Sequence, residues 1–261
     1  MNPPADSLVT CAMHGHVCLL TLNRPAKRNA VSDALVDALG GAFTRLPADA
    51  RAVVLAGAGD HFCAGLDLSE LTDRDVFQGI QHSRNWHAAL DRIQYAAVPV
   101  VAVLHGAVVG GGLEIASAAH VRVAEKSAFY AFPEGQRGIF VGGGGSVRVP
   151  RLIGTARVAD MMLTGRVLDA DEGQAAGLTT YLVEPGHGLA KGLALAEKIA
   201  ANAPMTNYAL IQALPRIAEL APEQGLFMES LVAAIAQAEP AAKERLRAFL
   251  DGKAGKVGRP S

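Results

Sequence analysis

Two strand-length runs of apolar residues, each followed by a glycine-rich junction, constrain the fold of this chain more than any other feature. The first run is RAVVLA at 51–56 and the second is VPVVAVL at 98–104. Nearly continuous apolar strands of this length are typical of parallel strands buried on both faces. Apolar residues at helical spacing occupy about 32–46, before the first run, and 75–94, between the two runs. The alternation predicts an α/β core with parallel strands.

The alternation of strands and helices ends near residue 185, and helical patterns follow alone. These patterns cover roughly 189–201, 206–220, 223–238 and 241–250. We therefore expect residues 1–187 to form the α/β core that carries the functional site, and residues 188–261 to form a helical region. The apolar faces of these last helices need a partner surface, either in this chain or in another.

The composition gives no support to several functional classes. The chain has 261 residues, 50% of them hydrophobic, and a formal net charge of −1 from 24 basic and 25 acidic side chains. Such a balance leaves no electrostatic footprint for nucleic acid. No apolar run approaches the ~20 residues of a membrane helix, and the start MNPPADSLVT lacks the features of a secretory signal. We expect a cytoplasmic protein without nucleic-acid or membrane partners.

The cysteines and histidines do not indicate a metal centre. The cysteines, Cys11, Cys18 and Cys63, are odd in number and lack CxxC spacing, which favours reduced thiols over a disulfide or a zinc site. His14 and His16 lie one residue apart, but no Cys, Asp or Glu is close to them in sequence. Such a pair is more typical of a polar hairpin turn than of a metal site.

The two glycine-rich junctions are candidates for binding negative charge. HFCAGLDL at 61–68 follows the first apolar strand, and HGAVVGGGLE at 105–114 follows the second. Glycine lets backbone N–H groups approach a ligand without an intervening Cβ. A helix N-terminus directs unpaired N–H groups at negative charge. Two such loops that face each other can supply two donors to one oxygen.

Three other glycine-containing stretches do not match the nucleotide-binding or nucleophile motifs that they partly resemble. Gly57-Ala58-Gly59 begins like a dinucleotide fingerprint, but Phe62 stands where the third glycine is required. The run at 142–145 is not followed by the GK[ST] of a phosphate-binding loop. A serine nucleophile elbow at Ser146 would need glycine at the position of Arg148.

Glu114 and Glu134 are ordinary residues when taken alone. Glu114 fits a carboxylate favoured by a helix N-terminus, and Glu134 fits a solvated turn residue. The segments around them, in their order along the chain, nevertheless resemble the enoyl-CoA hydratase/isomerase (crotonase) superfamily. The resemblance is carried by LNRPAKRNAVS, HFCAGLDL, HGAVVGGGLEIA, FPEGQRGIFVGGGGSVRVPRLIG, LTGRVLDADEGQAAGL and TTYLVE.

The resemblance implies a fold and an activity. The fold would be a crotonase-like spiral of repeated ββα units over 1–187, with 188–261 assembling a homotrimer or a dimer of trimers. The activity would be that of an enoyl-CoA hydratase acting on an acyl-CoA thioester, with coenzyme A as part of the substrate and no separate cofactor. The alternatives are an enoyl-CoA isomerase, an acyl-CoA hydrolase, and a non-catalytic member that binds RNA or a partner.

The resemblance also implies roles for individual residues. The backbone N–H groups of Leu66 and Gly111 would hold the thioester oxygen as an oxyanion hole. Glu134 would donate a proton to Cα, and Glu114 would hold the attacking water. The residues expected along coenzyme A are Lys27, Arg28, Cys63, Ala64, Gly65, Asp67 and Leu68.

One stretch departs from the family pattern. Gly135-Gln136-Arg137 follows Glu134 where apolar residues are usual, and Phe140-Val141 replaces a proline-containing turn. Arg137 is then a surface residue, a residue that faces a polar or carboxylated acyl group, or a partner of Glu134. We expect Arg137 and Phe140 to belong to the acyl pocket.

Overall fold

The computed structural model describes residues 7–70 and 74–252, which belong to two compact units, 1–200 and 201–261. The strands are β1 (Val9–His14), β2 (Val17–Leu22), β3 (Ala52–Gly57), β4 (Val100–Leu104), β5 (Ala107–Val109), β6 (Val121–Glu125), β7 (Phe129–Ala131), β8 (Leu168–Asp169) and β9 (Tyr181–Val183). The helices of the first unit are η1 (Pro25–Lys27), α1 (Asp33–Thr44), η2 (Leu68–Glu70), α2 (Val76–Gln94), α3 (Gly111–Ala118), η3 (Gly135–Arg137), α4 (Gly145–Ile153), α5 (Thr155–Thr164), α6 (Ala170–Ala176) and α7 (Gly188–Ala200). The helices of the second unit are α8 (Pro204–Gln212), α9 (Leu214–Ile217), α10 (Pro222–Ala238) and α11 (Pro240–Leu250).

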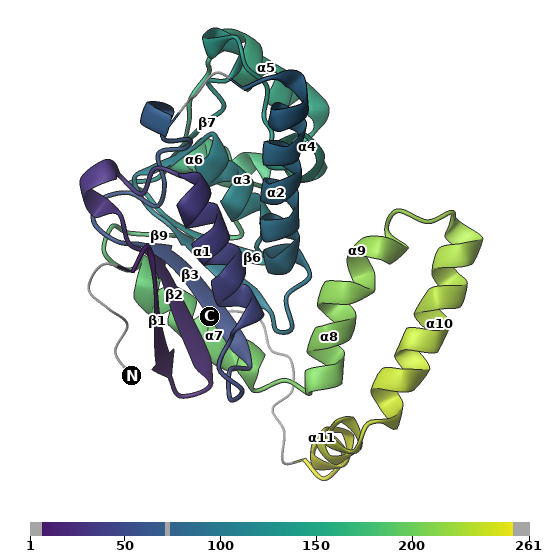
Figure 1. Ribbon diagram of the computed structural model, residues 1–261. Helices are drawn as coiled ribbons and strands as arrows, with labels where there is room; N and C mark the ends of the chain where they lie inside the picture. The colour runs from purple at the N-terminus through teal and green to yellow at the C-terminus, as the bar shows by residue number, and fades with distance from the viewer. Residues whose placement is uncertain (1–6, 71–73, 253–261) are drawn as a thin grey trace. The chain divides into compact units, whose positions relative to one another are not determined.

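The first unit contains two sheets (Figure 1). The larger sheet has six strands in the order β1-β2-β3-β4-β6-β9, and the smaller has three in the order β5-β7-β8. In the larger sheet β1 and β2 form an antiparallel hairpin, whereas all the other neighbours are parallel. The predicted α/β core with parallel strands is therefore confirmed.

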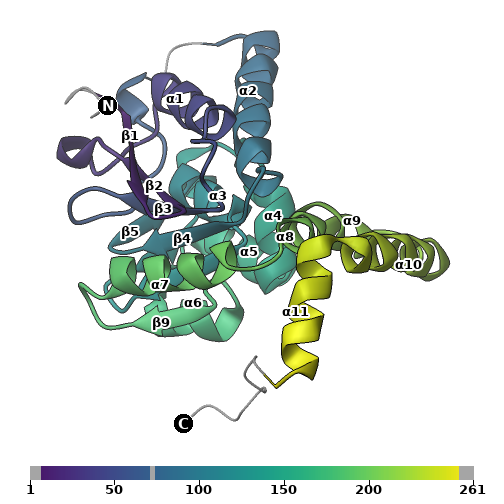
Figure 2. The same cartoon turned by 90° about the horizontal axis from the view of Figure 1, so that it is seen from below.

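Successive residues of the central strands face two different cores. Val53 and Leu55 of β3 belong to the main core, which also contains buried residues of α1 and α2. Val54 belongs to a second core with Val103 of β4 and Ala196 of α7. Figure 2 shows α7 running along the sheet. Burial on both faces explains why the strands read as nearly continuous apolar runs.

The N-terminal hairpin has the turn that its histidines predict. His14 pairs with Val17, so that Gly15 and His16 form the connection, and Gly15 has a φ of 58°. Within the residues that the structure describes, no three His, Cys, Asp or Glu side chains gather as metal ligands. The described helices include none that is long and apolar enough to cross a membrane.

Two features differ from the sequence-based expectation. The helix expected over 206–220 is divided into α8 and α9, because Pro215 has no N–H to continue the helical hydrogen bonds. The compact units divide after residue 200 rather than at 187, because α7 packs against β3 and β4. Gly192 permits this close packing, since a Cβ at that position would lie 2.4 Å from Cγ2 of Val103.

Candidate active site

The two glycine-rich junctions lie side by side. They follow β3 and β4, which are parallel neighbours, so both leave the sheet at the same edge. The Phe62 N–H donates to the His105 carbonyl at 2.8 Å. The Cys63 N–H donates to the Ala107 carbonyl at 2.9 Å, and the Cys63 carbonyl accepts from the Val109 N–H at 3.1 Å. The predicted pairing of the two loops is therefore present.

Asn29 holds the first junction in place. Its side chain is fully buried, and its backbone has a left-handed φ of 54°. The amide nitrogen donates to the carbonyls of Ala58 and His61 at 2.9 and 2.7 Å. The amide oxygen accepts from the Arg24 N–H at 2.9 Å. One side chain thus satisfies three backbone groups that the turn would otherwise leave unpaired.

Two backbone N–H groups without acceptors line a common cavity. Leu66 and Gly111 both contribute to its wall. Gly111 is the first residue of α3, a position whose N–H has no acceptor inside the helix. In the described chain neither N–H has a hydrogen-bond partner. Gly65, with a φ of 93°, lets the first loop approach the second, since a Cβ there would lie 2.8 Å from the Val109 carbonyl oxygen.

The cavity is small and mixes apolar and charged walls. Its volume is ≈ 180 Å³, below the roughly 300–1,000 Å³ of typical ligand pockets. It is lined by Leu66, Arg74, His82, Trp86, Gly111, Glu114, Glu134, Ile139, Phe140, Val141, Gly142 and Gly143. Both predicted glutamates and both predicted N–H donors are therefore brought together.

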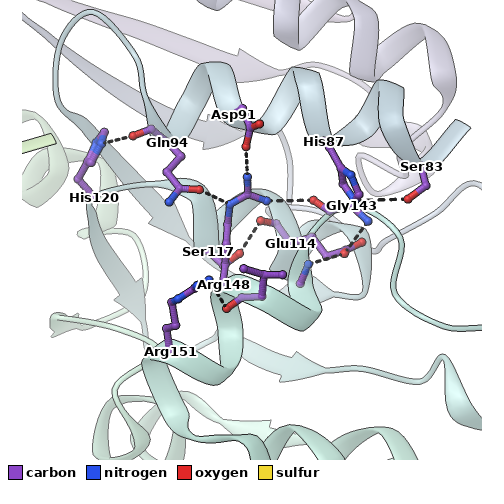
Figure 3. Close-up of polar contacts among 12 residues, drawn as sticks. Ser83, His87, Asp91, Gln94, Glu114, Ser117, His120, Gly143, Arg148 and Arg151 are labelled. Atoms are coloured by element: carbon purple, nitrogen blue, oxygen red, sulfur yellow. Dashed lines mark hydrogen bonds and ion pairs between the residues drawn. The ribbon is translucent and has the colours of Figure 1, made fainter. Parts of the chain in front are cut away.

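Glu114 is a buried carboxylate with strong donors. Its Oε1 accepts from the N–H groups of Gly143 and Gly145, both at 2.8 Å (Figure 3). Gly145 is the first residue of α4, so the positive end of that helix faces the carboxylate. Burial raises the pKa of Glu114, while the two N–H groups and the charge of Arg148 oppose the rise.

Arg148 fixes the loop that supplies these donors. Its guanidinium donates to the Gly143 carbonyl at 3.1 Å and to Asp91 Oδ1 at 2.6 Å. Its Nε donates to Gln94 Oε1 at 2.6 Å (Figure 3). Asp91 and Gln94 belong to α2, so Arg148 ties the start of α4 to that helix. The Gly143 N–H is thereby kept directed at Glu114.

Glu134 lies in a different environment. It follows β7 at the start of η3, and only 8% of its surface is exposed. Its Oε2 is buried without a hydrogen-bond partner in the part of the chain described. Burial raises the pKa of Glu134 to about 7; the charge of Glu114 adds to the rise, and that of Arg137 opposes it. Of the two carboxyl groups, Glu134 has fewer contacts that stabilise an ionised form.

The residues expected along coenzyme A have varied surroundings. Lys27, Arg28 and Leu68 are exposed, whereas Cys63 is fully buried. Burial raises the pKa of the Cys63 thiol to about 12. Asp67 is also buried and accepts hydrogen bonds from Ser69 and Arg24, which lower its pKa. Cys63 and Asp67 are thus occupied in shaping the loop. Ala64 and Gly65 form the remainder of the predicted stretch.

Of the two residues expected in the acyl pocket, only one lines the cavity. Phe140 lines the cavity with 69% of its surface exposed. Arg137 is exposed and does not line it. Within the described residues Arg137 forms no ion pair with Glu134, although its charge affects the pKa of that carboxyl group.

Sequence reasoning missed several residues of the site. Asn29 lies within LNRPAKRNAVS, where the sequence assigned a role only to the basic residues. Arg148 entered the sequence analysis only because it occupies a position where a nucleophile motif requires glycine. Arg74, His82 and Trp86 come from α2 and the residues just before it. Helical periodicity indicates which face of such a helix is apolar, but gives no signal that a residue reaches a cavity.

We predict that Asn29→Ala lowers the free energy of unfolding by about 2–4 kcal/mol, because it removes three buried hydrogen bonds and keeps a left-handed backbone. Asn29→Gly is the matched control, since it loses the same bonds without the backbone strain, and it should cost about 1 kcal/mol less. Urea unfolding measures both variants. A loss below about 1 kcal/mol in Asn29→Ala would contradict this role.

The raised pKa of Glu134 leads to a prediction of how the free energy of unfolding depends on pH. Its pKa rises from 4.5 to about 7 on folding, so its protonated form contributes stability below pH 4.5 that is lost as the pH rises through 7. Glu134→Gln removes this loss. The variant should exceed the wild type in free energy of unfolding by about 1–3 kcal/mol at pH 8, with a smaller difference at pH 5.

Chemical unfolding at both pH values measures this difference. Glu229→Gln, on an exposed position of α10, controls for the removal of one negative surface charge. A stability difference between Glu134→Gln and the wild type that is the same at both pH values would refute the burial argument.

Comparisons with known proteins agree with this geometry. Residues 12–256 match the enoyl-CoA hydratase/isomerase family. The chain is 33% identical over 255 residues to the enoyl-CoA hydratase EchA19 of Mycobacterium tuberculosis H37Rv, covering 95% of each chain. The crystal structure of a provisionally named enoyl-CoA hydratase from Rhodopseudomonas palustris CGA009 shares 59% identity, with a TM-score of 0.92 and coverage of 95% of this chain and 96% of that one.

The crystal structure of an enoyl-CoA hydratase from Bacillus anthracis has a TM-score of 0.88 at 30% identity, covering 94% of this chain and 97% of that one. These structures confirm the expected crotonase fold. The family match spans nearly the whole chain and contains both glycine-rich junctions and both glutamates. The chain is a member of the enoyl-CoA hydratase/isomerase (crotonase) superfamily.

Proposed function

We propose that this protein is an enoyl-CoA hydratase, which adds water across the α,β double bond of an enoyl-CoA thioester. The observation that carries the proposal is one cavity lined by Glu114 and Glu134, both buried, and by Leu66 and Gly111, whose N–H groups have no partner among the described residues. The relatives that bear the name enoyl-CoA hydratase support it.

The N–H groups of Leu66 and Gly111 would hold the thioester oxygen. Attack of water at Cβ moves electrons through Cα onto that oxygen and forms an enolate. Fixed donors in a site that excludes water stabilise such developing charge, with each donor worth about 3 kcal/mol. Because neither N–H has an acceptor among the described residues, binding the oxygen breaks no hydrogen bond within that part of the chain.

The two glutamates would divide the proton transfers. Glu114, with two N–H donors and Arg148 nearby, would be the carboxylate that orients the water and accepts its proton. Glu134, whose pKa of about 7 keeps a proton available near neutrality, would donate that proton to Cα. Each turnover leaves Glu114 protonated and Glu134 ionised, so a proton must return to Glu134 before the next one.

The other assignments follow from the same proposal. Coenzyme A would run along residues 64–68, with Lys27 and Arg28 near its phosphates. A cytoplasmic location fits the free cysteines. The second unit would assemble a homotrimer or a dimer of trimers, because its helices expose many large apolar side chains. These include Leu226, Phe227, Leu231, Ile235, Leu246, Phe249 and Leu250.

We predict that the purified protein removes the conjugated absorbance of crotonyl-CoA and forms 3-hydroxybutyryl-CoA. Glu114→Gln and Glu134→Gln should each lower kcat by about 10²–10⁴-fold, because each removes one proton transfer and keeps the size of the side chain. Absorbance and mass spectrometry of the product measure the reaction. A shifted double bond or free coenzyme A as the main product would assign isomerase or hydrolase activity instead.

A further inference from the structure

The cavity contains two basic side chains that hydration does not use. Arg74 lies just before α2, and His82 lies on the second turn of that helix. Both line the cavity that holds Glu114 and Glu134. The side chain of Arg74 is 24% exposed and that of His82 21% exposed. Hydration of an enoyl thioester needs an oxyanion hole, a base and an acid, so these two side chains have no task in the chemistry itself.

Asp33 holds both side chains in place. Its Oδ2 accepts from Arg74 Nη2 at 2.9 Å, and its Oδ1 lies 2.8 Å from His82 Nε2. Asp33 is the first residue of α1, is half exposed, and does not line the cavity. It therefore fixes Arg74 and His82 from outside the cavity.

The guanidinium of Arg74 keeps donors for a ligand. A guanidinium has five N–H groups in a planar fork. Among the residues that the structure describes, Arg74 donates only through Nη2, to Asp33. The remaining N–H groups match the two oxygens of a carboxylate, and such charge-assisted pairs are about twice as strong as neutral hydrogen bonds.

The cavity that contains the two glutamates and Arg74 also has apolar walls, which suit an acyl chain. Trp86, Ile139, Phe140 and Val141 line the same space. Its volume of ≈ 180 Å³ lies below that of typical ligand pockets. An acyl chain in this cavity would contact apolar side chains and the arginine that Asp33 holds.

We propose that Arg74, positioned by Asp33, binds a carboxylate at the far end of a short acyl chain. The preferred substrate is then an enoyl-CoA thioester whose acyl group ends in a carboxylate, not in a methyl group. This inference rests on the proposed hydratase function and names its substrate class. Arg137, which the sequence suggested as a residue facing a carboxylated acyl group, does not line the cavity, and Arg74 would bind the carboxylate instead.

The phosphates of coenzyme A are a second source of anionic oxygens. They are the same in every substrate, whereas the terminal carboxylate is present in only some. A comparison of two acyl groups of equal length therefore separates the two sources. Hex-2-enoyl-CoA and the mono-CoA thioester of hex-2-enedioic acid differ only in having a methyl or a carboxylate end.

We predict that the wild type has a higher kcat/KM for the carboxylate-ended thioester. Arg74→Met should lower that kcat/KM by about 10–100-fold, the range for loss of a charged hydrogen bond, and should change that for hex-2-enoyl-CoA by less than about threefold. Arg74→Lys should restore part of the loss, because it keeps the charge but not the fork. Arg84→Met, an exposed arginine of α2 outside the cavity lining, should change neither substrate.

An equal loss on both substrates in Arg74→Met would overturn the proposal, because it would assign Arg74 to coenzyme A or to the fold. A wild type that prefers hex-2-enoyl-CoA would also overturn it. Binding of the saturated analogues adipyl-CoA and hexanoyl-CoA, measured by calorimetry, keeps the test separate from catalysis. If neither enoyl thioester reacts but adipyl-CoA binds more tightly in an Arg74-dependent manner, the hydratase proposal fails and the tail recognition stands.

Discussion

The hydrogen bonds from Gly143 and Gly145 to Glu114 are the contacts on which the rest of the site depends. Two carboxyl groups in one small cavity resist ionising together. Burial raises the pKa of Glu114, and these two N–H groups together with Arg148 oppose that rise. Oε2 of Glu134 is buried and has no donor among the described residues. The difference in surroundings lets similar side chains serve as base and acid.

The fold supplies these contacts through constraints that act far from the chemistry. Because β3 and β4 are parallel neighbours buried on both faces, the loops that follow them meet at one edge. Asn29 then holds the first loop with two hydrogen bonds from its amide nitrogen, while its amide oxygen accepts a third from the Arg24 N–H. Arg148 joins the start of α4 to α2, so the positions of Gly143 and Glu114 depend on a helix that begins near residue 76. Substrate recognition by Arg74 would use the N-terminal end of that same helix.

Much of this arrangement could be predicted from the sequence, for identifiable reasons. RAVVLA and VPVVAVL predicted buried strands, because a continuous apolar run is typical of a strand that is buried on both faces. Pro215 also indicates the break between α8 and α9, although the helical pattern alone predicted one continuous helix there. Glu114 and Glu134 were found by their place among ordered motifs. Arg74 and His82 were not, because which side chains of a helix reach a cavity is decided by packing against segments distant in sequence. Arg137 lies only three residues after Glu134 in the chain, yet it does not line the cavity.

The division of the two glutamates into base and acid is the central claim, and a direct titration tests it. Carbon-13 NMR of protein labelled at the glutamate side-chain carboxyl carbon follows each group, with Glu114→Gln and Glu134→Gln assigning the signals. We expect the signal lost in Glu134→Gln to titrate near pH 7, and the signal lost in Glu114→Gln to titrate at a lower pH. The reverse order, with Glu114 holding its proton to the higher pH, would contradict the account.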